Sequence, residues 1–299
     1  DGEFLINHNS SFHVPDNYKV LNTEGSIIRA IEENKTLLDT ILSLELPKPL
    51  YFIYENSNGD TLNAYFLKPV DFDSTKKYPV LVYTYGGPGY QVLKNEYDGF
   101  NYFWHTYLTE MGFIVALVDV RGTGGRGRSF RENTYSKLGE LETEDISEIT
   151  KYIKRMSFTD ENRFGIWGWS YGGYLSSLLA MQGGVFNAVI AVAPVTSWRF
   201  YDSVYSERYL GLPKDNTNGY DWNSPINLAD GLDAKYLLIH GTGDDNVHIQ
   251  NSLMMQNALI EVNKQFDVFY YPDRNHGIYG GNTRLHLYHL MTNFLLENL

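Results

Sequence analysis

Near its middle, the chain reads Gly165-Ile166-Trp167-Gly168-Trp169-Ser170-Tyr171-Gly172-Gly173-Tyr174. This stretch contains the pattern Gly-x-Ser-x-Gly, and it joins an apolar run to a segment with helical character. A sharp turn from a strand into a helix lifts a serine hydroxyl clear of the backbone, and it leaves room only for very small residues two positions before and after. The helix N-terminus then directs free N–H groups toward the place where negative charge develops. The stretch therefore predicts a nucleophilic Ser170.

The pattern alone is a modest signal. A random chain of this length with average glycine and serine content contains it on the order of one time in ten. An ordinary glycine-rich turn between a strand and a helix would also produce it. The context favours catalysis, because a strand is predicted before Ser170, a helix after it, and two partner groups downstream.

The composition indicates a protein with a full hydrophobic core and an acidic charge balance. The chain has 299 residues, 43% of them hydrophobic, and a formal net charge of −12. The charge argues against nucleic-acid binding, which requires a basic face. No apolar run reaches the roughly 18 to 20 residues that span a bilayer. The lack of cysteine excludes disulfides and thiolate metal sites. The histidines also lack a metal-binding spacing such as His-Glu-x-x-His. We therefore expect no metal and no cofactor.

The first 47 residues differ in pattern from the rest of the chain. Alternating runs at 4–7, 18–21 and 27–31 are typical of strands, with turns expected at Pro15-Asp16-Asn17 and Glu24-Gly25.

Asn34 is a candidate cap for a helix that follows these strands, with apolar positions between 37 and 42, and that ends before Pro47. Three strands and one helix are too few for a core of their own. We therefore expect residues 1–47 to be the remnant of a larger N-terminal β domain with a linker helix, and residues 48–299 to form the main domain.

From residue 50 onward, the pattern indicates a mostly parallel sheet. Segments 50–55 and 61–68 predict a hairpin with its turn at Asn58-Gly59-Asp60. Apolar runs then alternate with helical segments: the runs cover 79–85, 113–118, 163–167, 188–193, 236–239 and 266–271, and the helical segments lie near 142–156, 171–182, 247–262 and 284–298. Such alternation is typical of a parallel sheet buried on both faces. Eight strands, with the serine turn after the fifth, predict an α/β-hydrolase fold with flanking helices.

A serine nucleophile needs a base, and the base needs a carboxylate that orients it. In this fold, the order along the chain is Ser, then Asp or Glu, then His, each in a loop after a strand. Of the eight histidines, only His276 lies between the last predicted strand and the last predicted helix. The others occupy positions typical of structural or surface histidines, including His105 on a predicted helix and His240 at a strand end. His276 is therefore the candidate base.

The candidate acid lies in the loop after the strand that ends at His240. Asp244 and Asp245 are adjacent in this loop, and spacing does not choose between them. One is expected to face the imidazole, and the other to cap a helix that begins near Asn246.

Longer motifs resemble the dipeptidyl peptidase IV branch of the prolyl oligopeptidase family. They are Trp167-Gly168-Trp169-Ser170-Tyr171-Gly172-Gly173-Tyr174, His240-Gly241-Thr242-x-Asp244-Asp245-Asn246-Val247-His248, Asn275-His276-Gly277-Ile278, and Ala193-Pro194-Val195-Thr196-Ser197-Trp198 with 201–209. The similarity covers essentially the whole chain. It implies a serine exopeptidase that releases N-terminal dipeptides, Xaa-Pro and less well Xaa-Ala, through a Ser-Asp-His triad and an acyl-enzyme. It also implies that residues 1–47 are the remnant of an N-terminal β-propeller, otherwise missing here, and that residues 48–299 are the catalytic domain.

Carried over position by position, the resemblance implies a role for each member of the site. Ser170 is the nucleophile, Asp244 the acid and His276 the base. Tyr85 and the backbone N–H of Tyr171 form the oxyanion hole, where two preorganised donors would meet the oxyanion as it forms. The resemblance also implies a proline pocket of flat rings and branched side chains, formed by Tyr171, Val195, Trp198, Tyr201, Tyr205 and Val247. It implies that Asn246 contacts the carbonyl group that precedes the proline.

The glycine-rich loop 119–125 is interpreted as structural, with Arg121 in a local pair. A phosphate-binding role is disfavoured, because the loop lacks the Lys-Ser/Thr ending of a P-loop.

The resemblance leaves the substrate length open. In the family, two adjacent glutamates and an arginine on the propeller hold the substrate, and these residues lie outside the present chain. Prolyl tripeptidyl peptidases and acylaminoacyl peptidases are therefore alternatives. A general esterase is less favoured, because the pocket motif matches the proline-specific branch. A binding protein without activity is also less favoured, because all triad residues are present. The expected partners are peptides with proline or alanine at the penultimate position. The resemblance also allows a homodimer through the catalytic domain and indicates an exported location, the bacterial periplasm or cell surface.

Overall fold

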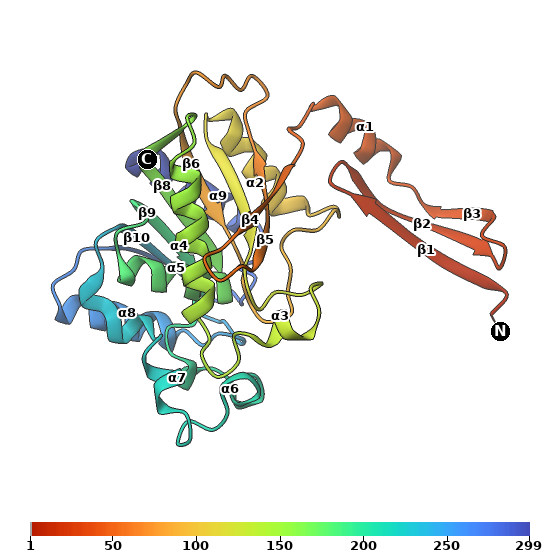
Figure 1. Ribbon diagram of the computed structural model, residues 1–299. Helices are drawn as coiled ribbons and strands as arrows, with labels where there is room; N and C mark the ends of the chain where they lie inside the picture. Colours follow the sequence, from red (N-terminus) through yellow and green to blue (C-terminus); the bar gives the residue numbers. More distant parts are fainter. Residues whose placement is uncertain (1) are drawn as a thin grey trace.

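The computed structural model describes residues 2–299 (Figure 1). The strands are β1 (Phe4–Ser11), β2 (Val14–Asn22), β3 (Ile27–Glu32), β4 (Leu50–Glu55), β5 (Thr61–Leu67), β6 (Tyr78–Tyr83), β7 (Ile114–Asp119), β8 (Thr159–Trp169), β9 (Ala188–Val192), β10 (Lys235–Gly241) and β11 (Asp267–Tyr271). The helices are α1 (Lys35–Ser43), α2 (Gly99–Glu110), α3 (Arg128–Glu132), α4 (Glu140–Lys154), α5 (Tyr171–Gln182), α6 (Ser203–Leu210), α7 (Thr217–Asp221), α8 (Gln250–Glu261) and α9 (Thr283–Asn298), with short 3₁₀ segments at Trp198–Phe200 and Pro225–Gly231.

The main sheet has eight strands in the order β11-β10-β9-β8-β6-β7-β5-β4. β5 is antiparallel to its two neighbours, β4 and β7, and the other neighbouring pairs are parallel. Ser170 follows β8, the fifth strand of this sheet along the chain. The predicted eight-stranded, mostly parallel α/β-hydrolase sheet is confirmed.

Helices cover both faces of the main sheet, as the apolar runs require. β6, β7 and β9 are buried along their whole length, because alternate side chains enter two separate hydrophobic clusters. One cluster packs β-sheet residues such as Val80 against α4, α5 and α8, and the other packs residues such as Leu81 against α2 and α9. In Figure 1, α4 and α5 accordingly lie in front of the sheet, and α2 and α9 lie behind it. Both layers orient the loops at the carboxyl ends of the strands.

The first three strands form a separate antiparallel sheet in the order β1-β2-β3, which projects to one side in Figure 1. The three predicted strands exist, but the turn expected at 15–17 is wrong, because Pro15 lies inside β2. A register shift between Asn9 and Ser11 of β1 places an extra residue in β2 there, and a bulge tolerates a proline that has no N–H to donate. The turn at Glu24-Gly25 is confirmed, since the Gly25 N–H donates to the Asn22 carbonyl at 3.0 Å.

Asn34 is the N-cap residue of α1, as predicted, but its side chain does not supply the capping hydrogen bond. Asn34 has a left-handed backbone (φ 48°) and makes no side-chain cap to α1. Its amide instead donates to the carbonyl of Asp16 at 2.7 Å, and this bond ties the start of α1 to β2.

Two contacts join separate parts of the fold. At the turn between β1 and β2, His13 Nε2 lies 2.6 Å from the Tyr102 hydroxyl on α2. After β7, the Arg121 guanidinium binds Asp145 at 2.8 Å and Glu144 at 2.7 Å, both on α4. The expected structural pairing of Arg121 is therefore confirmed, with a helix rather than within its own loop. Among the helices of residues 2–299, none is both long and apolar enough to cross a membrane.

Candidate active site

Ser170 occupies the sharp turn between β8 and α5. Its backbone dihedrals, φ 59° and ψ −116°, lie in a region that residues other than glycine seldom adopt. Backbone hydrogen bonds hold it there, since its N–H donates to the Val192 carbonyl at 2.8 Å and its carbonyl accepts from the Tyr174 N–H at 2.9 Å. Strain stored at a residue that its surroundings hold so firmly is typical of a functional position.

The glycines around Ser170 are required for close backbone approach, as the sequence predicts. A Cβ atom on Gly168 would overlap the backbone of Gly172, and one on Gly172 would overlap the carbonyl oxygen of Thr84 after β6. A Cβ on Gly173 would come within 2.8 Å of the Val192 carbonyl oxygen on β9. Since all three obstacles are backbone atoms, no side-chain rotation could relieve them.

Asp244 and His276, from the loops after β10 and β11, meet at the same edge of the sheet. Asp244 Oδ2 lies 2.7 Å from His276 Nδ1, and Asp244 Oδ1 accepts from the N–H groups of Asn246 and Val247, both at 2.9 Å. Burial alone would raise the pKa of Asp244, but hydrogen bonds from His240 and His276 and the charge of His276 hold it well below its usual range. Asp244 is therefore an ionised and rigidly held partner for the imidazole.

The helix-capping role expected for the other acid of this loop is not found. α8 begins only at Gln250, and Asp245 is exposed, with no side-chain hydrogen bond among residues 2–299. The backbone of this turn is bound by Asp244 instead, since one of its carboxylate oxygens faces the imidazole and the other accepts from the N–H groups of Asn246 and Val247.

His240 is a member of the site that the sequence analysis set aside. It is fully buried, and its Nε2 lies 2.8 Å from the Val247 carbonyl and 3.2 Å from Asp244 Oδ2. Its Nδ1 lies 2.6 Å from the Ser252 hydroxyl on α8. The imidazole therefore links the strand, the acid and the helix. The only sequence signal was its position at the end of the strand that carries the acid.

Ser170 and His276 are brought together through the residue before the serine. The Trp169 indole N–H donates to the His276 carbonyl at 3.0 Å, which ties the last loop to the serine turn. Within residues 2–299, His276 Nε2 makes no hydrogen bond to the Ser170 hydroxyl. Contacts of this kind are often long without substrate and tighten when it binds.

Tyr85 follows β6 and faces the serine. Burial raises the pKa of Tyr85, and a hydrogen bond with the Ser170 side chain partly opposes the shift. Its ring lies 6.1 Å from that of Tyr171, centroid to centroid, so the phenol is held at the start of α5. Its hydroxyl remains a neutral donor at physiological pH.

Aromatic side chains cluster around Tyr171, the residue that follows the serine. The Trp198 ring lies 5.4 Å from Tyr171, 5.8 Å from Tyr201 and stacks on Tyr205 at 5.8 Å. Val195 and Val247 belong to the same buried cluster. The Tyr201 hydroxyl donates to Asn246 Oδ1 at 2.9 Å, and this bond joins the aromatic cluster to the loop of Asp244. The residues expected to bind proline thus converge in space, although they come from three stretches of chain, after β8, β9 and β10.

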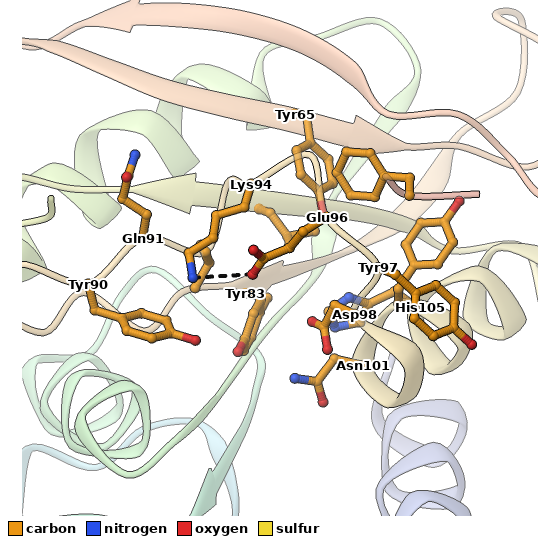
Figure 2. Close-up of a pocket in the computed structure, with 14 residues that line it drawn as sticks. Tyr65, Tyr83, Tyr90, Gln91, Lys94, Glu96, Tyr97, Asp98, Asn101 and His105 are labelled. Atoms are coloured by element: carbon orange, nitrogen blue, oxygen red, sulfur yellow. Dashed lines mark ion pairs between the residues drawn. The ribbon is translucent and has the colours of Figure 1, made fainter. Parts of the chain in front are cut away.

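A cavity of about 170 Å³ lies on the α2 side of the sheet (Figure 2). Tyr65 and Tyr83 line it, and Lys94 and Glu96 form an ion pair of 3.2 Å there. His105 at its wall accepts a hydrogen bond from the Trp167 indole at 3.0 Å, and burial lowers the pKa of His105 to about 3. This histidine is structural, as expected, and none of the three triad candidates lines the cavity.

The fold and the strained serine turn define a hydrolase of the α/β-hydrolase class. Comparison with known proteins agrees: residues 100–299 match the model described as the prolyl oligopeptidase family. Prolyl endopeptidase FAP of Mus musculus is 44% identical over 276 residues, covering 90% of this chain and 36% of that protein. Dipeptidyl peptidase 4 of Sus scrofa is 39% identical over 275 residues, covering 90% of this chain and 35% of that protein.

A solved structure gives the same result. The crystal structure of Porphyromonas gingivalis dipeptidyl peptidase 4 aligns with a TM-score of 0.94 and 41% identity, over 99% of this chain and 42% of that one. The chain belongs to the prolyl oligopeptidase family of serine peptidases, and its resemblance to the dipeptidyl peptidase IV branch is confirmed. It spans little more than a third of the length of these curated relatives.

Proposed function

We propose that this chain is the catalytic part of a serine exopeptidase that releases N-terminal dipeptides, Xaa-Pro and less well Xaa-Ala. The observation that carries the proposal is the aromatic cluster around Tyr171, directly beside the strained Ser170. Flat rings stacked at close range fit the rigid, apolar pyrrolidine ring of proline, and an alanine side chain would fill the same slot less completely.

The proposed reaction is acyl transfer through Ser170. The Ser170 hydroxyl attacks the carbonyl carbon of the proline residue, and His276 Nε2 takes its proton. Asp244 Oδ2 stabilises the resulting imidazolium through the bond to Nδ1. His276 then returns the proton to the leaving amine, and a water molecule, activated in the same way, hydrolyses the acyl-enzyme.

Two donors are proposed to meet the oxyanion, the Tyr85 hydroxyl and the N–H of Tyr171. The Tyr171 N–H is one of the free amides at the start of α5, so the helix dipole adds to its effect. The Tyr85 hydroxyl already lies against the Ser170 side chain. Both donors are held before the charge develops, so little reorganisation is needed in the transition state.

We also propose that residues 1–47 belong to a β-propeller and its linker, and that residues 48–299 form the catalytic domain. The small sheet exposes large apolar side chains on each of its strands, including Ile6, Tyr18 and Ile27. Such side chains favour coverage by further strands. The match of this chain to only part of its relatives' length agrees with this division.

The test of the proposed function is the product formed from a peptide with proline at the second position. The complete polypeptide that contains this chain is expected to release a dipeptide, identified by mass spectrometry, and to prefer a free amino terminus. Release of a tripeptide would replace the proposal by the tripeptidyl alternative. Residues 1–299 alone should cleave Gly-Pro substrates more slowly, and should treat N-terminally blocked and free substrates alike, because the charge pair that orients the amine cannot form.

The proposed oxyanion donor gives a second prediction. Tyr85→Phe removes one hydroxyl and keeps the ring, so kcat should fall by about 10²–10³ while KM changes little. Tyr90→Phe is the matched control, because its ring packs on Tyr85 at 4.6 Å but its side chain is largely exposed. Steady-state kinetics on one Gly-Pro substrate check the result. A raised KM with unchanged kcat would instead make Tyr85 a wall of the binding site.

A further inference from the structure

Glu142 is a buried carboxylate that the proposed reaction does not use. It lies in the first turn of α4, its side chain is fully buried, and its Oε2 accepts from the Gly139 N–H at 3.0 Å. Its Oε1 accepts from the Tyr171 hydroxyl at 2.7 Å. One carboxylate thus joins the start of α4 to the first residue of α5.

The environment of Glu142 lacks a compensating cation. Among residues 2–299, no lysine, arginine or histidine forms an ion pair with it, and Arg121 binds Glu144 and Asp145 instead. The titratable groups that face Glu142 are Asp145 on the same helix, Tyr171 and Tyr174 on α5, and Tyr205 on α6. A buried carboxylate without a cation is costly, and an amide or a hydroxyl could cap α4 without that cost. Capping of α4 therefore does not explain why a carboxylate at position 142 contacts Tyr171.

Tyr171 is the residue through which Glu142 reaches the site. Its ring is 98% buried, lies 5.4 Å from Trp198 and 6.1 Å from Tyr85, and follows Ser170 directly. A shift of this ring would change the width of the pocket and the orientation of the N–H at the start of α5. The bond to an ionised carboxylate is charge-assisted, and such bonds are about twice as strong as neutral ones.

We propose that Glu142 is a positioning residue for the proline pocket, where its carboxylate holds the Tyr171 hydroxyl and thereby the ring that forms the pocket wall. This inference rests on the proposed function, since it concerns the selectivity of the same site. Burial raises the pKa of Glu142 to about 7, and hydrogen bonds from Tyr171 and the backbone partly oppose the shift. The carboxylate is therefore ionised above neutral pH and becomes protonated below it, where its hold on Tyr171 weakens.

The test is the ratio of kcat/KM for Gly-Pro and Gly-Ala derivatives of one chromophore, measured on the full chain. An effect of pH that acts on both substrates alike cancels in the ratio, so the ratio isolates the pocket. The wild type should lose selectivity for proline from about pH 8 to about pH 6. Glu142→Gln, which is neutral at every pH, should show a ratio about tenfold lower at the higher pH and no pH dependence. Glu140→Gln is the matched control, because Glu140 lies in the same turn but is exposed and pairs with Lys137.

A second variant keeps the inference testable if Glu142→Gln folds poorly. Tyr171→Phe retains the ring and removes the hydroxyl, so it should lower the ratio similarly, and the double variant should lose no more than either single one. The inference would be overturned if Glu142→Gln showed the same ratio and the same pH profile as Glu140→Gln, whatever the melting temperature of Glu142→Gln. A wild type that labels with a fluorophosphonate at Ser170 but cleaves neither substrate would instead overturn the proposed function.

Discussion

Replacing Ser170 by alanine is expected to lower kcat for a Gly-Pro chromogenic substrate by about 10⁶, by analogy with other serine triads. The hydroxyl is the proposed nucleophile, and no neighbouring group can form the acyl-enzyme in its place. The fold should not change, because alanine keeps the Cβ atom at φ 59° and the backbone bonds to Val192 and Tyr174 remain. Full-length polypeptide is the material for the assay, and circular dichroism confirms that the variant is folded.

Ser176→Ala is the matched control for this variant. Ser176 lies on the same helix and is fully buried, and its hydroxyl has no hydrogen-bond partner among residues 2–299. Its removal should therefore leave kcat within about twofold, as expected for a group outside the reaction. If Ser170→Ala kept a tenth of the wild-type rate, Ser170 could not be the nucleophile.

Asp244→Asn is expected to lower kcat by about 10⁴. The carboxylate accepts on both of its oxygens, from two backbone N–H groups on one and from His276 and His240 on the other. An asparagine must direct its NH₂ group at one of these sets of donors. Either the turn loses its hydrogen bonds, or His276 is forced into the tautomer that cannot accept the serine proton.

Asp245→Asn separates this effect from a general disturbance of the loop. Asp245 is exposed, so the change should alter kcat by no more than about twofold. Equal losses in the two variants would show that the loop as a whole, and not the bond between Asp244 and His276, supports the reaction.

The serine turn and the strands could be predicted because their signals are local. In the structure, a Cβ atom at position 168, 172 or 173 would clash with backbone atoms, as the steric argument requires. The N-terminal segment was harder to predict, because Pro15 is a typical turn residue yet lies in a bulge of β2. A bulge depends on pairing with β1, and such pairing between strands is not visible in the residues around the proline.

The sequence by itself determined the order of the strands and of the longer helices, the serine turn and the single histidine in the last loop, since periodicity and glycine sterics act over a few residues. The short helices α3, α6 and α7 were not predicted. Spacing left the choice between Asp244 and Asp245 open, and the tertiary structure shows that Asp244, the residue that the resemblance implied, contacts His276. The tertiary structure also places His240 3.2 Å from the same carboxylate. It alone placed Glu142 against Tyr171, 29 residues further along the chain. These contacts join separate loops at one edge of the sheet, and their geometry depends on how all the strands between them pack.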